Sequence, residues 1–144
     1  MPANQSPIYS RLADVQWSSA ALINGSTETN ITNSSTTYIV FTSDATNGGY
    51  IQKLRFKPVP TVSTLVTVGR VWINNGLTST NAVNSVLYDD ISLPVATGSS
   101  IASTPSYEMP LNFALPAGYR LIVTLGATMG TSTGWNVTAV AGKY

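Results

Sequence analysis

The strongest constraint on the fold is an alternation of apolar and polar residues with a period of two. Residues 107–115 read Tyr-Glu-Met-Pro-Leu-Asn-Phe-Ala-Leu, so every odd position is large and apolar. Because successive side chains of a β-strand point to opposite faces, this pattern predicts a strand with one buried face. Pro110 has no amide hydrogen to give to a neighbour, which places this strand at a sheet edge or at a break.

The same pattern predicts strands along the whole chain. Residues 116–118 (Pro-Ala-Gly) form a turn into a second strand at 119–125. Further strands are predicted at 15–23, 37–42, 50–57, 65–73, 83–93 and 135–141. Seven to eight strands in 144 residues predict one all-β domain, a single antiparallel β-sandwich that is jelly-roll-like. We assign it to residues 14–144 and interpret residues 1–13 as an N-terminal arm or a disordered segment.

The missing residue types limit the chemistry. The chain has no Cys and no His, which removes disulfides, thiolate nucleophiles, imidazole bases and the usual zinc ligands. Asp89 and Asp90 are adjacent, but neighbours on a strand point to opposite faces, so a glycosidase pair would need Glu108 from another strand. We therefore predict that the protein is not an enzyme and holds neither a cofactor nor a metal. Calcium at the 44–48 turn or at the Asp89-Asp90 pair is the alternative.

Charge is scarce throughout the chain. Charged residues make up 9% of the sequence, against about 25% in an average soluble protein, and the net charge is +1. The surface therefore consists mainly of Ser, Thr and Asn, which suits either burial in an assembly or an extracellular exterior. Neither nucleic acid nor a membrane is a predicted partner, because no basic field and no apolar run of about 18 residues is present. The first residues lack the basic and apolar parts of a signal peptide.

Three cations stand at alternate positions of the strand predicted at 50–57. Lys53, Arg55 and Lys57 would project from one face of a sheet, roughly 7 Å apart. One interpretation is a solvated outer face that guards the strand against aggregation. The other is a protein interface, a docking stripe for an acidic protein surface.

Arg70 and Trp72 form a second candidate interface. Gly69 predicts a β-bulge, which would put Val66 and Val68 on the inner face and turn Arg70 and Trp72 outward. Trp and Arg are the residue types most enriched at binding hot spots. Burial of Trp72 beneath a loop, or in the core if the register runs the other way, is the alternative.

Several segments together resemble small virion proteins of tailed bacteriophages, of the capsid decoration or cement type. The resemblance lies in the order and spacing of strand motifs over about residues 14–144. The segments are Tyr50-Ile-Gln-Lys-Leu-Arg-Phe-Lys-Pro58, Gly69-Arg-Val-Trp-Ile-Asn-Asn-Gly76, Ile91-Ser-Leu-Pro94, Leu115-Pro-Ala-Gly-Tyr-Arg-Leu-Ile-Val-Thr-Leu125 and Gly134-Trp-Asn-Val-Thr-Ala-Val-Ala-Gly-Lys-Tyr144. It implies a β-sandwich without catalytic residues that binds the major capsid protein on the outside of the head, often as a homotrimer.

On this resemblance we expect a structural virion protein that is made in the bacterial cytoplasm and bridges capsid subunits. The segment before Asp14 would then be an arm lying across a neighbour. Two other functions stay open. One is a head-fibre or tail-tip module that binds host carbohydrate through exposed aromatic side chains such as Trp72, Tyr107 or Trp135. The other is a structural protein of the tail or connector.

Overall fold

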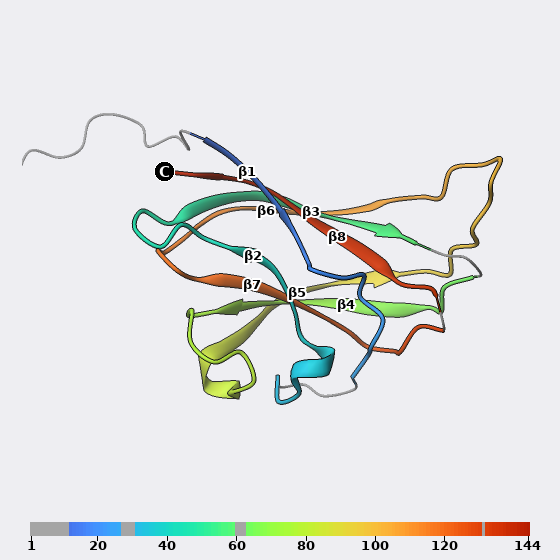
Figure 1. Ribbon diagram of the computed structural model, residues 1–144, viewed down its shortest axis with the longest axis horizontal. Helices are drawn as coiled ribbons and strands as arrows, with labels where there is room; N and C mark the ends of the chain where they lie inside the picture. The colour runs from blue at the N-terminus through green and yellow to red at the C-terminus, as the bar shows by residue number, and fades with distance from the viewer. Residues whose placement is uncertain (1–11, 27–30, 60–62, 131) are drawn as a thin grey trace, which may run out of the picture.

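Eight strands form two packed antiparallel sheets in the computed structural model, which describes residues 12–26, 31–59, 63–130 and 132–144 (Figure 1). The first sheet has the strand order β1-β8-β3-β6 and the second has the order β2-β7-β4-β5. The strands are β1 (Leu12–Trp17), β2 (Tyr38–Thr42), β3 (Gly49–Pro58), β4 (Thr67–Asn74), β5 (Ser85–Leu93), β6 (Tyr107–Leu115), β7 (Arg120–Leu125) and β8 (Trp135–Lys143). Two short 3₁₀ helices, η1 (Ser34–Thr36) and η2 (Ala82–Asn84), complete the elements. The predicted all-β sandwich is confirmed.

The strand pairing is that of a jelly roll. β1 pairs with β8, β2 with β7, β3 with β6 and β4 with β5, so the chain is one long hairpin whose first half pairs with its second. The hairpin is rolled up, which brings β3 beside β8 and β4 beside β7. Rolling a hairpin in this way produces two facing sheets of four strands each.

The N-terminal strand begins and ends earlier than predicted. β1 spans Leu12–Trp17 instead of 15–23, so residues 12 and 13 of the predicted arm belong to the sandwich, and residues 1–11 lie outside the described residues. After Trp17 the chain leaves the first sheet and runs across to the second (Figure 1). Along this path Leu22 bridges to Trp135 in the first sheet and Gly25 bridges to Leu125 in the second.

The bulge predicted at Gly69 is wrong. Gly69 alternates regularly with Val71 in β4, and a Cβ on Gly69 would lie 3.0 Å from the ring of Phe56, so this position faces the core. Val66 accordingly precedes β4 and is exposed, and Val68 is only half-buried. The register shift lies between Val71 and Trp72, and the extra residue is on the partner strand β5.

Pro110 lies on an edge strand, as its missing amide hydrogen predicts. β6 is the outer strand of the first sheet, and its pairing with β3 shifts between Ile51 and Lys53. Two residues of β6 therefore oppose one residue of β3, and one of them, Asn112, has a φ of +54°. The proline and this bulge together interrupt the ladder next to the sheet edge.

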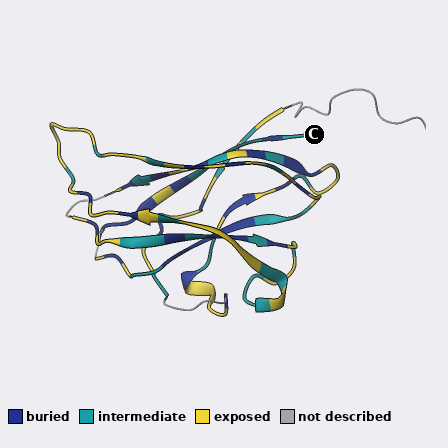
Figure 2. Ribbon diagram, turned by 180° about the vertical axis from the view of Figure 1, so that it is seen from behind, coloured by how far each residue is buried: buried dark blue, intermediate teal, exposed yellow. Residues whose placement is uncertain are grey.

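The core fills the space between the two sheets (Figure 2). Alternate residues of the strands contribute to it from both sides, which is what the period of two predicts. Its largest fully buried side chains are Trp135, Phe41, Phe56, Leu22, Ile51, Leu54, Leu93, Leu121, Leu125, Val40 and Val71.

A side-chain amide joins the free edges of the two sheets where β1 faces β2. Gln16 Nε2 donates to the Thr42 carbonyl at 2.9 Å, and the Thr42 amide donates to Gln16 Oε1 at 2.9 Å. The amide group thus pairs with Thr42 as a neighbouring backbone would. We call this contact the Gln16 clamp.

Candidate functional site

The predicted cations share the outer face of the first sheet. Leu54 and Phe56 of β3 are fully buried, so Lys53, Arg55 and Lys57, which alternate with them, project away from the core. We call these three residues the cation row. β3 lies between β8 and β6, which holds the backbone of the row on both sides.

All three side chains of the cation row extend towards β6 and the stretch before it. Lys53 Nζ forms an ion pair with Glu108, 3.0 Å from Oε2. Lys57 Nζ donates to the Thr104 carbonyl. Arg55 Nη2 donates to the Ser106 hydroxyl at 3.3 Å. Each cation uses only part of its donor capacity in these contacts, since a lysine has three donors and an arginine five. Among the described contacts of the cation row, the three positive charges thus have a single carboxylate partner, that of Glu108.

Arg70 and Trp72 lie on the second sheet and do not join the cation row. Both alternate with the inward Val71, so they point away from the core, but the Trp72 side chain is only 3% exposed. It packs with Ile31, and its Nε1 donates to Thr124 Oγ1 at 3.0 Å. Of the two arrangements considered for Trp72, the structure therefore has the one in which the ring is buried beneath a loop. The ring offers no surface to a partner.

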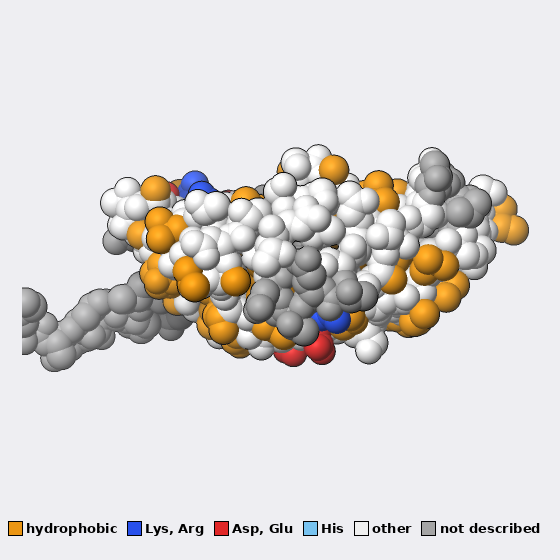
Figure 3. Space-filling view, turned by 90° about the horizontal axis from the view of Figure 1, so that it is seen from below, with side chains coloured by type: hydrophobic (Ala, Val, Ile, Leu, Met, Phe, Trp, Pro, Cys, Tyr) orange, Lys and Arg blue, Asp and Glu red, His pale blue; other side chains and the backbone are white. Residues whose placement is uncertain are grey.

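The acidic residues considered for catalysis lie on different sheets. Asp90 is the register partner of Arg70 in the second sheet, whereas Glu108 belongs to the first sheet and pairs with Lys53. The two carboxylates that a glycosidase places around one bond are therefore not brought together. Charged side chains are also sparse on the side of the molecule seen in Figure 3. In the described ranges, no group of three or more acidic, Cys or His residues could hold a metal ion.

Asp44 organises the turn between β2 and β3. The backbone N–H groups of Asn47 and Thr46 donate to its Oδ1 at 2.9 Å each, and these bonds lower the pKa of the carboxyl below its usual value. The Asp44 carbonyl also accepts from the amides of Gly48 and Gly118. The carboxylate considered for calcium thus already holds the turn together.

Trp17 is the exposed tryptophan of the chain, and no pattern in the sequence distinguishes it from the other two. Its side chain is 68% exposed at the end of β1, whereas Trp135 is fully buried. The register partner of Trp17 is Thr138 in β8, whose partner in β3 is Arg55. Trp17 therefore lies on the same sheet face as the cation row, with two strand spacings, roughly 10 Å, between its backbone and that of Arg55.

The orientation of β1 explains why alternation did not reveal Trp17. Asp14 and Gln16 alternate with Val15 and Trp17, and alternation alone predicts the apolar pair inside. In the structure Gln16 reaches the second sheet through the clamp, while Val15 is 49% exposed on the outer face. The pattern is inverted on this edge strand, and exposed apolar side chains on an edge are typical of contact surfaces.

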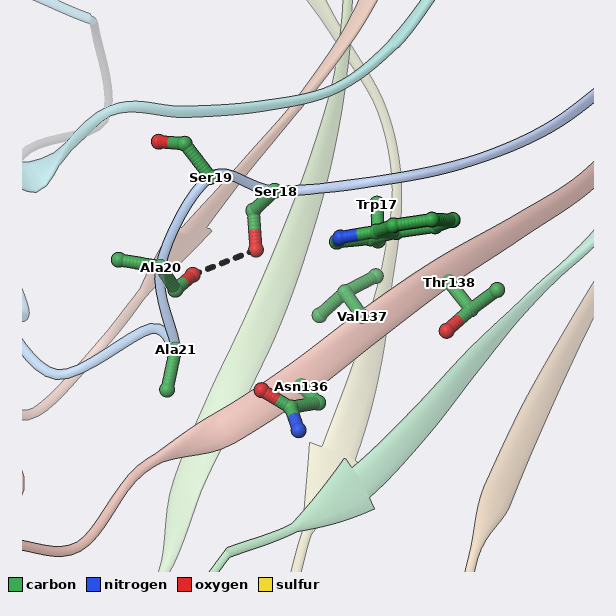
Figure 4. A pocket seen from close by; sticks show the side chains of 8 residues that line it. All are labelled: Trp17, Ser18, Ser19, Ala20, Ala21, Asn136, Val137 and Thr138. Carbon is green, nitrogen blue, oxygen red and sulfur yellow. Dashed lines mark hydrogen bonds between the residues drawn. The ribbon is translucent and has the colours of Figure 1, made fainter.

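A hollow of about 350 Å³ opens beside Trp17 (Figure 4). Residues 18–21, which follow β1, form one wall, and β8 residues 136–138 form the other. Ser18 Oγ donates to the Ala20 carbonyl at 2.6 Å, which fixes the first wall. The Asn136 amide and the Thr138 hydroxyl make no side-chain hydrogen bond within the described chain, and none of the residues that line the hollow is charged. We call it the Trp17 hollow.

The aromatic rings named for a carbohydrate module are not the exposed ones. Trp135 is fully buried, and Tyr107 is half-buried against it with the ring centres 5.9 Å apart. Trp72 is buried as well, so the prediction that the rings of Trp72 and Trp135 are exposed is wrong. The sequence does not separate the three tryptophans, because each lies beside or within a predicted strand.

The outer face of the first sheet thus carries two features, the cation row towards β6 and the Trp17 hollow at β1. No helix among the described residues is long and apolar enough to cross a lipid bilayer. In comparisons with known proteins, no family model, no curated protein and no solved structure matches this chain.

Proposed function

We propose that this protein is a non-enzymatic structural component of a tailed-bacteriophage virion. It decorates the outer surface of the capsid and cements neighbouring subunits of the major capsid protein. The observation that supports this best is the cation row, which places three of the seven Lys and Arg residues of the chain on one strand face. The resemblance of the strand motifs to decoration proteins supplies the class of partner.

The cation row suits a partner surface that carries carboxylates. Lys53 is already paired with Glu108, whereas among the described residues Arg55 and Lys57 contact only neutral oxygens. A carboxylate on a partner would be a stronger acceptor for these two cations than a hydroxyl or a carbonyl. Binding through the row should therefore weaken as salt is added, because exposed ion pairs are screened.

Each ion pair at such a surface stabilises by only about 0–1 kcal/mol, so one copy would bind weakly. A closed homotrimer presents the row three times, and simultaneous contacts raise the overall affinity by avidity. The binding free energy of many bound copies then adds to the stability of the shell by mass action. The central position of β3 helps, since a rigid strand keeps the three cations at a fixed spacing.

The test is the abundance of the chain in purified particles. Its band is quantified against the major capsid protein, for the unchanged chain, for Arg55→Glu and for the matched control Arg120→Glu on the second sheet. We expect hundreds of copies per particle, a several-fold loss for Arg55→Glu and no loss for Arg120→Glu. Absence from particles, a handful of copies, or equal losses for the two variants would overturn the proposal.

A further inference from the structure

We propose that the Trp17 hollow is a binding site for one neutral pyranose residue of a glycan. This inference goes beyond the docking role of the cation row and does not depend on it. It rests on the side chains that line the hollow: an exposed aromatic ring, hydrogen-bonding groups without partners among the residues that the structure describes, and no charge. A sugar ring combines an apolar C–H face with neutral hydroxyls, and these are the chemical counterparts of that lining.

The indole of Trp17 supplies the apolar platform. Its side chain stays 68% exposed, although Trp72 and Trp135 of the same chain are buried in the fold. Figure 4 shows the ring close to Val137 and Thr138 of β8, with the residues that follow β1 to one side. Aromatic rings contribute a large apolar area with little conformational freedom to lose, which favours stacking of a flat ligand on them.

Asn136 and Thr138 supply the polar contacts. They occupy alternate positions on the outer face of β8, so their side chains stand roughly 7 Å apart. The amide and the hydroxyl can each donate and accept, as sugar hydroxyls do. Because neither side chain has a hydrogen-bond partner within the described chain, a sugar replaces water at these groups and no bond between described residues has to break.

The charge of the site favours a neutral ligand. None of the lining residues is charged, and Arg55, which stands opposite Thr138 on β3, extends away towards β6. A phosphate or carboxylate in the hollow would find no cation among the residues that line it. Nucleotides and acidic sugars are therefore disfavoured, and neutral hexoses and N-acetylhexosamines are favoured.

The size and the rigidity of the hollow suit one sugar ring. Its volume of about 350 Å³ lies at the lower end of ligand sites, which span roughly 300–1,000 Å³. One wall is fixed by the bond from Ser18 to Ala20, and the other is β8 itself. A second hollow of about 430 Å³ shares Trp17, Ser18 and Ser19 with the first, is otherwise lined by residues 16 and 37–42, and gives room for the rest of a glycan. A preformed site of this kind loses little affinity to ordering.

Quenching of tryptophan fluorescence by acrylamide tests the proposal on the full chain. Trp72 and Trp135 are 3% and 0% exposed, so quenching in the folded protein reports on Trp17. The probes are the methyl pyranosides of glucose, galactose and mannose, and N-acetylglucosamine. We expect at least one of them to protect Trp17 saturably in the millimolar range, about −4 kcal/mol for a 1 mM dissociation constant.

Variants then locate the site by ligand-observed NMR, which needs no tryptophan. We expect Trp17→Ala to abolish binding and Asn136→Ala to weaken it roughly tenfold. Arg55→Glu, the variant that tests capsid docking, should keep the sugar affinity unchanged. Equal melting temperatures show that the variants are folded, which is expected for exposed positions.

The outcomes separate this site from the docking role. If none of the four sugars protects Trp17 saturably, or if Trp17→Ala binds sugar as the unchanged chain does, the sugar site is refuted while the cation row stands. If Arg55→Glu and Trp17→Ala abolish sugar binding equally, the site is not the Trp17 hollow, and the proposal fails as well.

Discussion

The Gln16 clamp gives the sharpest test of how the two sheets are held together at their open edge. Gln16→Ala removes both bonds to Thr42, one donated by Nε2 and one accepted by Oε1, each 2.9 Å long. It also removes the bond from Nε2 to Asp14 Oδ2 at 3.0 Å. The change leaves the backbone ladders of β1 with β8 and of β2 with β7 intact.

The expected loss follows from the number and the exposure of these bonds. A hydrogen bond within a protein contributes roughly 0.5–1.5 kcal/mol net, so the two bonds of the clamp are worth about 1–3 kcal/mol. Thr42 is exposed and its backbone groups can bind water in the variant, so the loss should lie in the lower half, about 1–2 kcal/mol. For a domain of this size this corresponds to a fall of roughly 3–6 °C in the melting temperature.

The assay is thermal unfolding followed by circular dichroism, with urea unfolding as a second measurement of the free energy. Gln16→Glu is the matched control, because it keeps the shape and the acceptor but at neutral pH loses the donor to the Thr42 carbonyl. A carboxylate there also faces Asp14, so this variant should lose at least as much stability as Gln16→Ala. In acid the protonated side chain regains a donor, and part of the loss should return.

A stabilising role of the clamp is refuted if the free energy of unfolding of Gln16→Ala lies within about 0.3 kcal/mol of that of the unchanged chain, because surface substitutions that remove no specific contact change stability by that little. It is also refuted if Gln16→Glu is as stable at pH 7 as the unchanged chain. Either result would mean that packing between the sheets, and not the clamp, holds β1 against β2.

Three further predictions concern one position in the core, one beneath a loop on the second sheet and one in a turn. Gly69→Ala should cost about 1–3 kcal/mol in urea, because its Cβ would lie 3.0 Å from the ring of Phe56; a neutral result would contradict the inward orientation of Gly69. Trp72→Phe should cost about 1–2 kcal/mol by leaving the Thr124 hydroxyl without its donor, and Thr124→Val in the same background should add little if the bond is the cause. The folded-state pKa of Asp44 is lowered, so its contribution to stability is present above its unfolded pKa and is lost as pH falls through the folded value. The stability difference between the unchanged chain and Asp44→Ala should therefore shrink below about pH 4 in pH-dependent unfolding, and a constant difference would exclude this carboxylate as the cause.

The strands whose sequence alternates regularly could be predicted closely. β6 begins and ends where the pattern of 107–115 predicts, and β3 extends the predicted 50–57 by one residue at each end. The orientation of the cation row followed from the same alternation, since Leu54 and Phe56 fix the inner face. These features depend on residues within a single strand.

The features that the sequence did not predict depend on contacts between distant segments. Trp72 is buried because Ile31, some forty residues earlier, packs over the second sheet, and no local pattern encodes that contact. Trp17 is exposed because the Gln16 clamp turns the polar side of β1 inward. The bulge opposite Trp72 is set by the pairing of β4 with β5, which a single glycine does not reveal.

The position of β8 within the first sheet has a consequence for how the molecule is made. β8 lies between β1 and β3 and pairs with both, although it is the strand synthesised after the other seven. A nascent chain on the ribosome therefore leaves the backbone edges of β1 and β3 that pair with β8 without their partner until residue 143 has emerged from the exit tunnel. Such distant pairing is typical of slow folding, so the time between translation and closure is when this chain is most exposed to aggregation and to chaperones.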